Sequence, residues 1–169
     1  MNRMPAQQIR VLAIDPFARG FGFAILEGAE CPIDWGVKEA RKDKAALCMR
    51  QIVRLIEYYQ PDVLVVEDWR DPGCRRCPRV RALLREILEL AASRKVTTRR
   101  FSRRTVRAAF AHCGAFSKHE IAGAIARHLP DLAPWQPPFR KSWMSEDYRE
   151  CIFDAFALAL AVFSCATKR

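Results

Sequence analysis

The 169-residue sequence predicts an α/β protein with a mixed five-stranded sheet, three antiparallel strands and then parallel strands, flanked by helices. Two apolar segments joined by one short turn, 9–15 and 21–27, predict an antiparallel pair near the N-terminus. A further apolar run at 63–67 follows a helical pattern, as expected for a crossover into a strand parallel to the first. Because half of the residues are hydrophobic, the chain can bury one sizeable core, and a single domain over residues 1–169 is expected.

The N-terminal part of the chain is expected to form three strands and a helix. The first strand is apolar throughout its centre, which is typical of a strand covered on both faces. A weaker third strand is expected near 32–38. Residues 43–60 predict a helix because apolar side chains recur at helical spacing, and a Pro-Asp pair ends it. Its apolar face consists of Ala46, Met49, Ile52, Val53 and Ile56.

The second half of the chain alternates helices with one more strand. A loop rich in Pro, Gly and Cys, 70–78, leads into a helix at 79–93, whose apolar stripe either packs in the core or forms a dimer interface. That stripe consists of Val80, Leu83, Leu84, Ile87, Leu88 and Ala91. The remaining elements are expected to be a strand near 96–101, short helices at 103–112 and 117–128, a proline-rich loop at 134–143 and a final helix from about Ser145.

Positive charge is concentrated in one segment. Residues 75–107 contain twelve basic and two acidic side chains, whereas the rest of the chain balances, so the net charge of +10 comes from this segment. A concentrated basic segment is typical of a protein that binds a polyanion, because each phosphate contact releases counterions; a solvated, solubility-promoting face is the alternative. The candidate nucleic-acid contacts here are Arg75, Arg76, Arg79, Arg99, Arg100, Arg103, Arg104 and Arg107. Trp69, just before this segment, could stack on an unpaired base or pack half-buried against the sheet rim.

The sequence favours a cytoplasmic protein without a membrane partner. Its start lacks the basic stretch and apolar run of a signal peptide, and Asp154 interrupts the apolar stretch near the C-terminus. Seven scattered cysteines, an odd number, fit reduced thiols. Only Cys74 and Cys77 have metal-ligand spacing. Because His112 and Cys113 are only loose candidates to complete a four-ligand zinc site, free thiols are favoured there.

Three carboxylates stand where their surroundings disfavour a charge. Asp15 ends the first strand, Glu67 ends the strand 63–67, and Asp154 interrupts the final apolar helix. The C-terminal ends of parallel strands meet at one sheet edge, so the first two should lie together, and the final helix could deliver the third. Clustered carboxylates are tolerated when divalent cations neutralise them, and all-oxygen ligands favour Mg²⁺ or Mn²⁺. Such a site could cleave phosphodiester bonds, whereas strand-end turns and helix caps are the alternative roles.

Three segments around these carboxylates resemble the acidic motifs of RuvC-type Holliday-junction resolvases, members of the ribonuclease H-like superfamily. The segments are Asp15–Ala24, Pro61–Glu67 and Asp154–Ala159. A fourth segment, Thr105–Lys118, resembles the region in which the family carries basic residues near the scissile phosphate. This likeness maps Arg107 and Lys118 to substrate contacts. The resemblance spans nearly the whole chain.

The resemblance implies a ribonuclease H-like nuclease domain, with an endonuclease activity that depends on Mg²⁺ or Mn²⁺. It further implies a homodimer that makes paired nicks in four-way or branched DNA during DNA recombination and repair. Asp15, Glu67 and Asp154 would be metal ligands, and Lys118 would join them in catalysis. A ribonuclease of the related YqgF type, acting on ribosomal RNA precursor, would differ only in substrate. A nucleic-acid-binding protein that kept the fold but cleaves weakly or not at all is the alternative from another class.

The sequence departs from the family pattern at two positions. Phe17 stands where the family usually has Gly after the Asp-Pro pair, so the turn can differ. Cys151 stands three residues before the last aspartate, where the family commonly carries a fourth ligand as Asp or His. A thiol is a poor ligand for a hard cation. Either a neighbouring acid substitutes, or catalysis is weakened.

Helix spacing favours Glu150 as the substitute ligand. It precedes Asp154 by four residues and so shares its helix face about one turn away. Asp147 precedes Asp154 by seven residues and is the second choice. In a helix that Ser145 caps, Asp147 would lie in the first turn, where negative charge is favourable and explains its presence. A solvent-facing side chain is the alternative role for Glu150.

Overall fold

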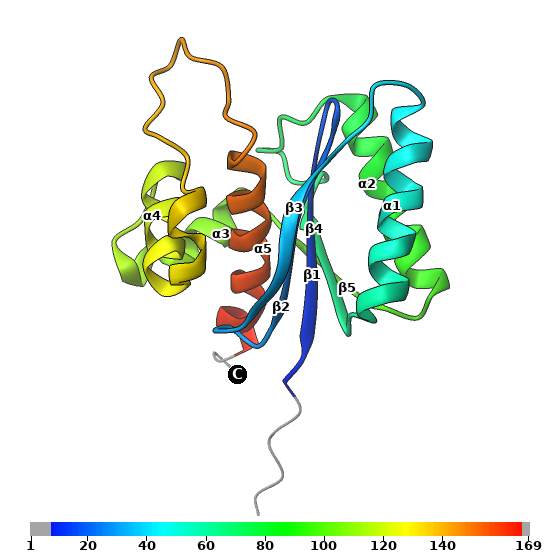
Figure 1. Ribbon diagram of the computed structural model, residues 1–169, viewed down its shortest axis with the longest axis horizontal. Helices are drawn as coiled ribbons and strands as arrows, with labels where there is room; N and C mark the ends of the chain where they lie inside the picture. The colour runs from blue at the N-terminus through cyan, green and yellow to red at the C-terminus, as the bar shows by residue number, and fades with distance from the viewer. Residues whose placement is uncertain (1–7, 167–169) are drawn as a thin grey trace, which may run out of the picture.

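The computed structural model describes residues 8–166 and confirms the predicted sheet (Figure 1). Its strands are β1 (Arg10–Phe17), β2 (Gly20–Glu27), β3 (Pro32–Glu39), β4 (Val63–Glu67) and β5 (Thr97–Phe101). They lie in the order β3-β2-β1-β4-β5. The first three strands pair antiparallel, whereas β4 runs parallel to β1 and β5 runs parallel to β4. The helical crossover after β3 therefore brings β4 in parallel to β1, as the sequence predicts.

Helices cover both faces of this sheet. On one face lie α1 (Lys44–Tyr59) and α2 (Pro78–Ser93) (Figure 1). On the other lie α5 (Glu150–Ala166), α3 (Arg103–Phe110) and α4 (Lys118–His128), with short 3-10 turns at Ala111–Cys113 and Pro130–Trp135. The second of these turns occupies the start of the expected proline-rich loop. No helix within residues 8–166 is long and apolar enough to cross a membrane.

The two faces explain why β1 is apolar at every central position. Val11 and Ala13 pack against α5, whereas Leu12 and Ile14 pack in the core that α1 and α2 cover. The apolar stripe of α2 belongs to this second core, because five of its six members are buried there and Leu88 is partly buried. The structure thus decides between core and dimer interface for this stripe in favour of core.

The final helix begins later than the sequence predicts. α5 starts at Glu150, so Asp147 lies in the preceding loop and not in a first helical turn capped by Ser145. The Asp147 carboxylate accepts the backbone N–H of Arg149 at 2.9 Å and pairs with its guanidinium at 2.7 Å. A side chain that bonds to the nearby backbone offers the chain an alternative to helical hydrogen bonds. This local bonding delays the helix, and the expected first-turn role of Asp147 is wrong.

Gly22 lets α5 lie directly against the sheet. It pairs with Asp15 across β1 and β2, and a Cβ at this position would lie 2.5 Å from the Cys151 carbonyl oxygen, at the start of α5. Backbone atoms cannot move aside as a flexible side chain can. Gly22→Ala should therefore push α5 outward and lower the free energy of unfolding by about 1–3 kcal/mol, as overpacking does, measured by chemical denaturation.

Gly123→Ala in α4 is the matched control for this substitution. The nearest atom to its added Cβ is the end of the Arg127 side chain at 3.4 Å, which can yield. Replacing a helical glycine with alanine should leave stability unchanged or raise it by up to about 1 kcal/mol. A Gly22→Ala variant as stable as the wild type would contradict the close approach of α5 to β2.

Candidate active site

Two buried carboxylates lie side by side at the edge of the sheet. Asp15 and Glu67 are only 3% and 5% exposed, and they are the only buried charged residues in the described part of the chain. Asp15 lies inside β1, which continues to Phe17, rather than at the strand end as expected. The parallel register pairs Ala13 with Val65, so two further residues along each strand bring Asp15 level with Glu67. The sheet topology therefore brings these two residues together, as the sequence predicts.

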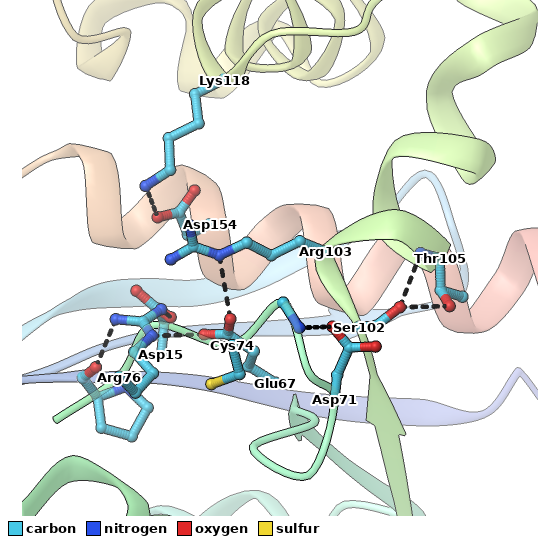
Figure 2. A network of polar contacts seen from close by, with 12 residues as sticks. Asp15, Glu67, Asp71, Cys74, Arg76, Ser102, Arg103, Thr105, Lys118 and Asp154 are labelled. Atoms are coloured by element: carbon cyan, nitrogen blue, oxygen red, sulfur yellow. Dashed lines mark hydrogen bonds and ion pairs between the residues drawn. The ribbon is translucent and has the colours of Figure 1, made fainter. Parts of the chain in front are cut away.

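One arginine side chain bridges both carboxylates. The Nη2 atom of Arg76 lies 2.5 Å from Asp15 Oδ1, and its Nε donates to Glu67 Oε2 (Figure 2). The third nitrogen, Nη1, donates to the Pro16 carbonyl at 3.0 Å. Glu67 also accepts from Arg103 Nε at 3.1 Å. The sequence predicts Arg76 as a nucleic-acid contact. The structure instead places its guanidinium against the two carboxylates.

Asp154 joins the pair from α5. Its carboxylate accepts from Lys118 Nζ at 2.7 Å, and Figure 2 shows Lys118 reaching across to it. Lys118 is the first residue of α4, where a capping box between Ser117 and Glu120 holds the start of the helix. Three carboxylates and four basic side chains, the fourth being Arg107, thus line a cavity of about 90 Å³. The protein itself supplies a cation beside each of these carboxylates.

Burial controls the protonation of these groups. It raises the pKa of Asp15 to about 7, and the nearby Asp154 and Glu67 carboxylates add to the rise, while Arg76 and Lys118 oppose it. The pKa of Lys118 is raised despite burial, because Asp154 stabilises its ammonium form. Lys118 is therefore cationic at neutral pH.

The structure separates the two candidates for a fourth acidic residue. Glu150, 13% exposed at its side chain, lies 3.4 Å from Arg140 Nε and shares a hollow of about 230 Å³ with Lys118 and Asp154. Burial raises the pKa of the Glu150 carboxyl. Asp147 turns to Arg149 instead and does not line this hollow. Of the two, only Glu150 has a side chain placed beside the cluster.

Cys151 has a structural environment. Its thiol donates a hydrogen bond to the Tyr148 carbonyl at 2.8 Å and is buried. Burial, together with Asp15 and Asp154, raises its pKa to about 12. The sulfur thus stays protonated at neutral pH, and only a thiolate is an effective metal ligand. Its side chain is therefore engaged with the Tyr148 carbonyl and offers no oxygen ligand.

The donor chemistry fits a hard divalent cation, but the arrangement holds a guanidinium. Asp15, Glu67 and Asp154 supply only oxygen atoms, as Mg²⁺ and Mn²⁺ require. Within residues 8–166, however, no group of three or more His, Cys, Asp or Glu side chains is placed to hold a metal ion. The Arg76 side chain lies between the two buried carboxylates. These residues fit a metal ion only after that side chain has moved.

The remaining basic candidates are exposed, and two of them, Arg103 and Arg107, line the acidic cavity. Arg99 and Arg100 lie on β5, and Arg103, Arg104 and Arg107 lie on α3, all with exposed side chains. Arg75 and Arg79 are also exposed, next to the bridging arginine. Arg103 also contacts Glu67, whereas Arg100 lies against Trp69 in the core that α1 and α2 cover. Arg103 and Arg107 therefore lie where a phosphate backbone could approach the acidic residues.

Trp69 is part of the core. The residue is 9% exposed, and the Arg70 and Arg100 guanidinium groups lie 5.7 and 5.5 Å from its ring centre. This placement corrects the expectation that Trp69 stacks on an unpaired base, because base stacking requires an open ring face. The alternative, a tryptophan packed against the sheet rim, describes its position.

The two cysteines with metal-ligand spacing lie in different environments. Cys74 is buried in the core that α1 and α2 cover, whereas Cys77 is exposed at the start of α2.

The sequence contains no local signal for the residues that support the cluster. Arg81 donates to the backbone carbonyls of Arg76 and Cys74 at 2.9 and 2.7 Å, and so holds the loop before α2. Arg140 contacts Glu150. Both are ordinary basic residues in the sequence, and their partners are known only from the fold.

Solved structures of junction resolvases share this fold, although no protein-family model and no curated protein sequence matches the chain. Thermus thermophilus RuvC in complex with a Holliday junction substrate is 16% identical, with a TM-score of 0.68 over 95% of this chain and 96% of that one. A second Thermus thermophilus RuvC structure is 20% identical, with a TM-score of 0.69 over 95% and 97%. The crystal structure of the yeast mitochondrial Holliday junction resolvase is 16% identical, with a TM-score of 0.64 over 95% and 81%. The chain therefore has the ribonuclease H-like fold of RuvC-type resolvases.

Proposed function

We propose that this protein is a Mg²⁺- or Mn²⁺-dependent endonuclease that cleaves branched DNA, with the four-way Holliday junction as its main substrate. The observation that carries the proposal is the convergence of Asp15, Glu67 and Asp154 at the edge of a RuvC-type sheet. Burial of the Asp15 and Glu67 carboxylates costs stability, and such costly groups are typical of functional sites. The exposed Arg103 and Arg107 at the same cavity, which belong to the basic segment 75–107, support a polyanionic substrate.

Each residue has a role that follows from its position. Asp15, Glu67 and Asp154, with Glu150 as fourth ligand, would hold the divalent cation, which supplies a Lewis acid and an activated water for phosphodiester hydrolysis. Lys118, cationic and 2.7 Å from Asp154, would stabilise negative charge that develops on the phosphate. The burial of Asp15 and Glu67 strengthens these interactions by excluding water.

The proposed assembly is a homodimer of one nuclease domain per chain. A four-way junction requires two nicks in opposite strands, and two active sites related by symmetry meet this need. The apolar stripe of α2 is buried within the subunit, so the dimer would use another surface. A cytoplasmic location, with the cysteines reduced, completes the proposal.

Two observations favour a second candidate function. The Arg76 bridge and the buried, protonated Cys151 would also suit a protein that binds nucleic acid but cleaves it weakly. A YqgF-type ribonuclease would use the same carboxylates on an RNA substrate, and the described residues favour neither ribose nor deoxyribose. The two alternatives are therefore separated by cleavage and by substrate.

A cleavage assay with three substrates tests the proposal. Synthetic four-way junction, linear duplex of the same sequence and structured RNA are each incubated with Mg²⁺, Mn²⁺ or a chelator. We expect paired nicks in the junction only when metal is present. Tight junction binding without nicks would support the binding protein, whereas faster cleavage of RNA would support the ribonuclease.

Binding to the junction should weaken steeply with salt. Replacing Arg103, Arg104 and Arg107 together should flatten the slope of log K against log salt by about one unit for each phosphate that the variant no longer neutralises. Fluorescence anisotropy at several salt concentrations, without divalent metal, measures this slope. An unchanged slope would show that these arginines do not contact DNA.

A second triple variant controls for net charge. Arg41, Arg50 and Arg54 are exposed on α1 and the loop before it, and α1 covers the opposite face of the sheet from α3 (Figure 1). Replacing them removes the same charge, but should leave the slope within a few tenths of the wild-type value, because distant charges are screened.

A further inference from the structure

Arg76 satisfies both buried carboxylates with one planar group. Its side chain is 17% exposed, and its three nitrogens face Glu67, Asp15 and the Pro16 carbonyl. Two buried carboxylates without a cation would repel one another and lack most of their hydration. The guanidinium fork supplies the positive charge and the hydrogen bonds that both need. Within this structure, Arg76 is the internal counter-ion of the acidic pair.

The same oxygen atoms cannot serve Arg76 and a metal ion together. Asp15 Oδ1 and Glu67 Oε2 both accept from the guanidinium, and these carboxylates are the ones that the proposed function assigns to the metal. Two cations in one small buried space would also repel each other strongly. The guanidinium and a metal ion therefore compete for these carboxylates.

We propose that Arg76 is a tethered competitor of the divalent cation, so that metal binds at Asp15 and Glu67 only when the guanidinium swings out. This inference rests on the proposed function, because it takes a metal ion as the alternative partner of these carboxylates. In the resting site, Arg76 neutralises the carboxylates without a metal ion. Metal occupancy then depends on the position of the Arg76 side chain.

The side chain, not the loop backbone, is the moving part. Arg81 fixes the carbonyls of Cys74 and Arg76, and the buried Cys74 anchors the loop in the core. Rotation about the side-chain bonds of arginine needs no unfolding of this loop. The Arg76 side chain is already 17% exposed and lines the acidic cavity, so it can swing out toward solvent without crossing the core.

Direct measurement of Mn²⁺ binding without nucleic acid tests the inference. The electron paramagnetic resonance signal of free Mn²⁺ gives the affinity of wild type and of Arg76→Met, which keeps a long side chain but removes the charge and the fork. Release from competition with a charge-assisted bridge should tighten binding by at least about tenfold. Equal or weaker Mn²⁺ binding by Arg76→Met would overturn the proposal.

Three further variants make the result specific. Arg85→Met removes an exposed charge on α2 and should bind Mn²⁺ like the wild type. If it binds as tightly as Arg76→Met, the gain reflects net charge and the proposal fails. Asp15→Asn combined with Arg76→Met should lose the tight binding, and its retention would place the metal elsewhere. Arg76→Lys keeps a charge without the fork and should fall between wild type and Arg76→Met.

Further measurements distinguish a change in Mn²⁺ affinity from a folding defect and from failure of the proposed nuclease activity. Arg76→Met leaves the buried carboxylates without their bridge, so its circular dichroism spectrum and melting temperature are recorded with and without Mn²⁺. If it does not fold, Arg76→Lys decides, and Mn²⁺ affinity no tighter than wild type overturns the proposal. Normal junction nicking with unchanged Mn²⁺ affinity in the variants contradicts this inference alone. Tighter Mn²⁺ binding without any nicking by the wild type contradicts the proposed nuclease alone.

Discussion

Asp15→Asn is expected to abolish junction cleavage while leaving junction binding within a few-fold of wild type. The substitution removes the negative charge that would hold a cation and changes almost no volume, so the core beneath β1 stays packed. Loss of a residue that supports a metal ligand costs up to ~100-fold in activity, and loss of a ligand itself should cost more. Nicking of a labelled four-way junction under single-turnover conditions measures the loss.

Stability provides an internal control for this variant. Because burial raises the pKa of Asp15 to about 7, this carboxyl is only partly ionised at neutral pH, and an amide of the same size should not unfold the protein. We expect a melting temperature without metal at or above that of wild type. Asp43→Asn, at an exposed position with a left-handed backbone that asparagine tolerates, should change neither cleavage nor melting. Near-normal cleavage by Asp15→Asn at saturating Mg²⁺ would remove Asp15 from the active site.

Glu150→Gln should reduce cleavage by at least about 100-fold and raise the metal concentration needed, in line with the loss of a direct ligand. Its side chain lies in the hollow shared by Lys118 and Asp154, on the first turn of α5. Asp147→Asn should retain most activity, because Asp147 bonds to Arg149 outside that helix. Its main cost should be a small loss of order in the loop that leads into α5.

A metal-titrated nicking assay ranks these two variants. If Asp147→Asn is the more damaging, the role passes to Asp147, and the loop before α5 must rearrange when substrate binds. If neither matters, three carboxylates suffice, and Glu150 is only a counter-charge for Arg140. If Glu150→Gln cleaves far more slowly than Asp147→Asn, as expected, the result would support Glu150 as the fourth ligand in place of Cys151.

Local patterns predicted most of the fold. Apolar runs identified β1, β2 and β4, and helical spacing identified α1 and α2, because burial on one or both faces leaves a period in the sequence. The start of α5 was missed by about five residues. A bond between Asp147 and Arg149 competes there with the helix, and hydrophobic periodicity carries no trace of it.

The sequence by itself determined which carboxylates would meet. Asp15 and Glu67 follow from parallel strands that share an edge, and Asp154 from a charge inside an apolar helix. Only the tertiary structure decided what neutralises them. Arg76, 61 residues from Asp15 in the chain, was one of twelve basic residues in its segment, and its neighbours did not distinguish it. Ion pairs between distant segments depend on where a loop folds back over the sheet, and no periodic pattern in the sequence encodes that placement.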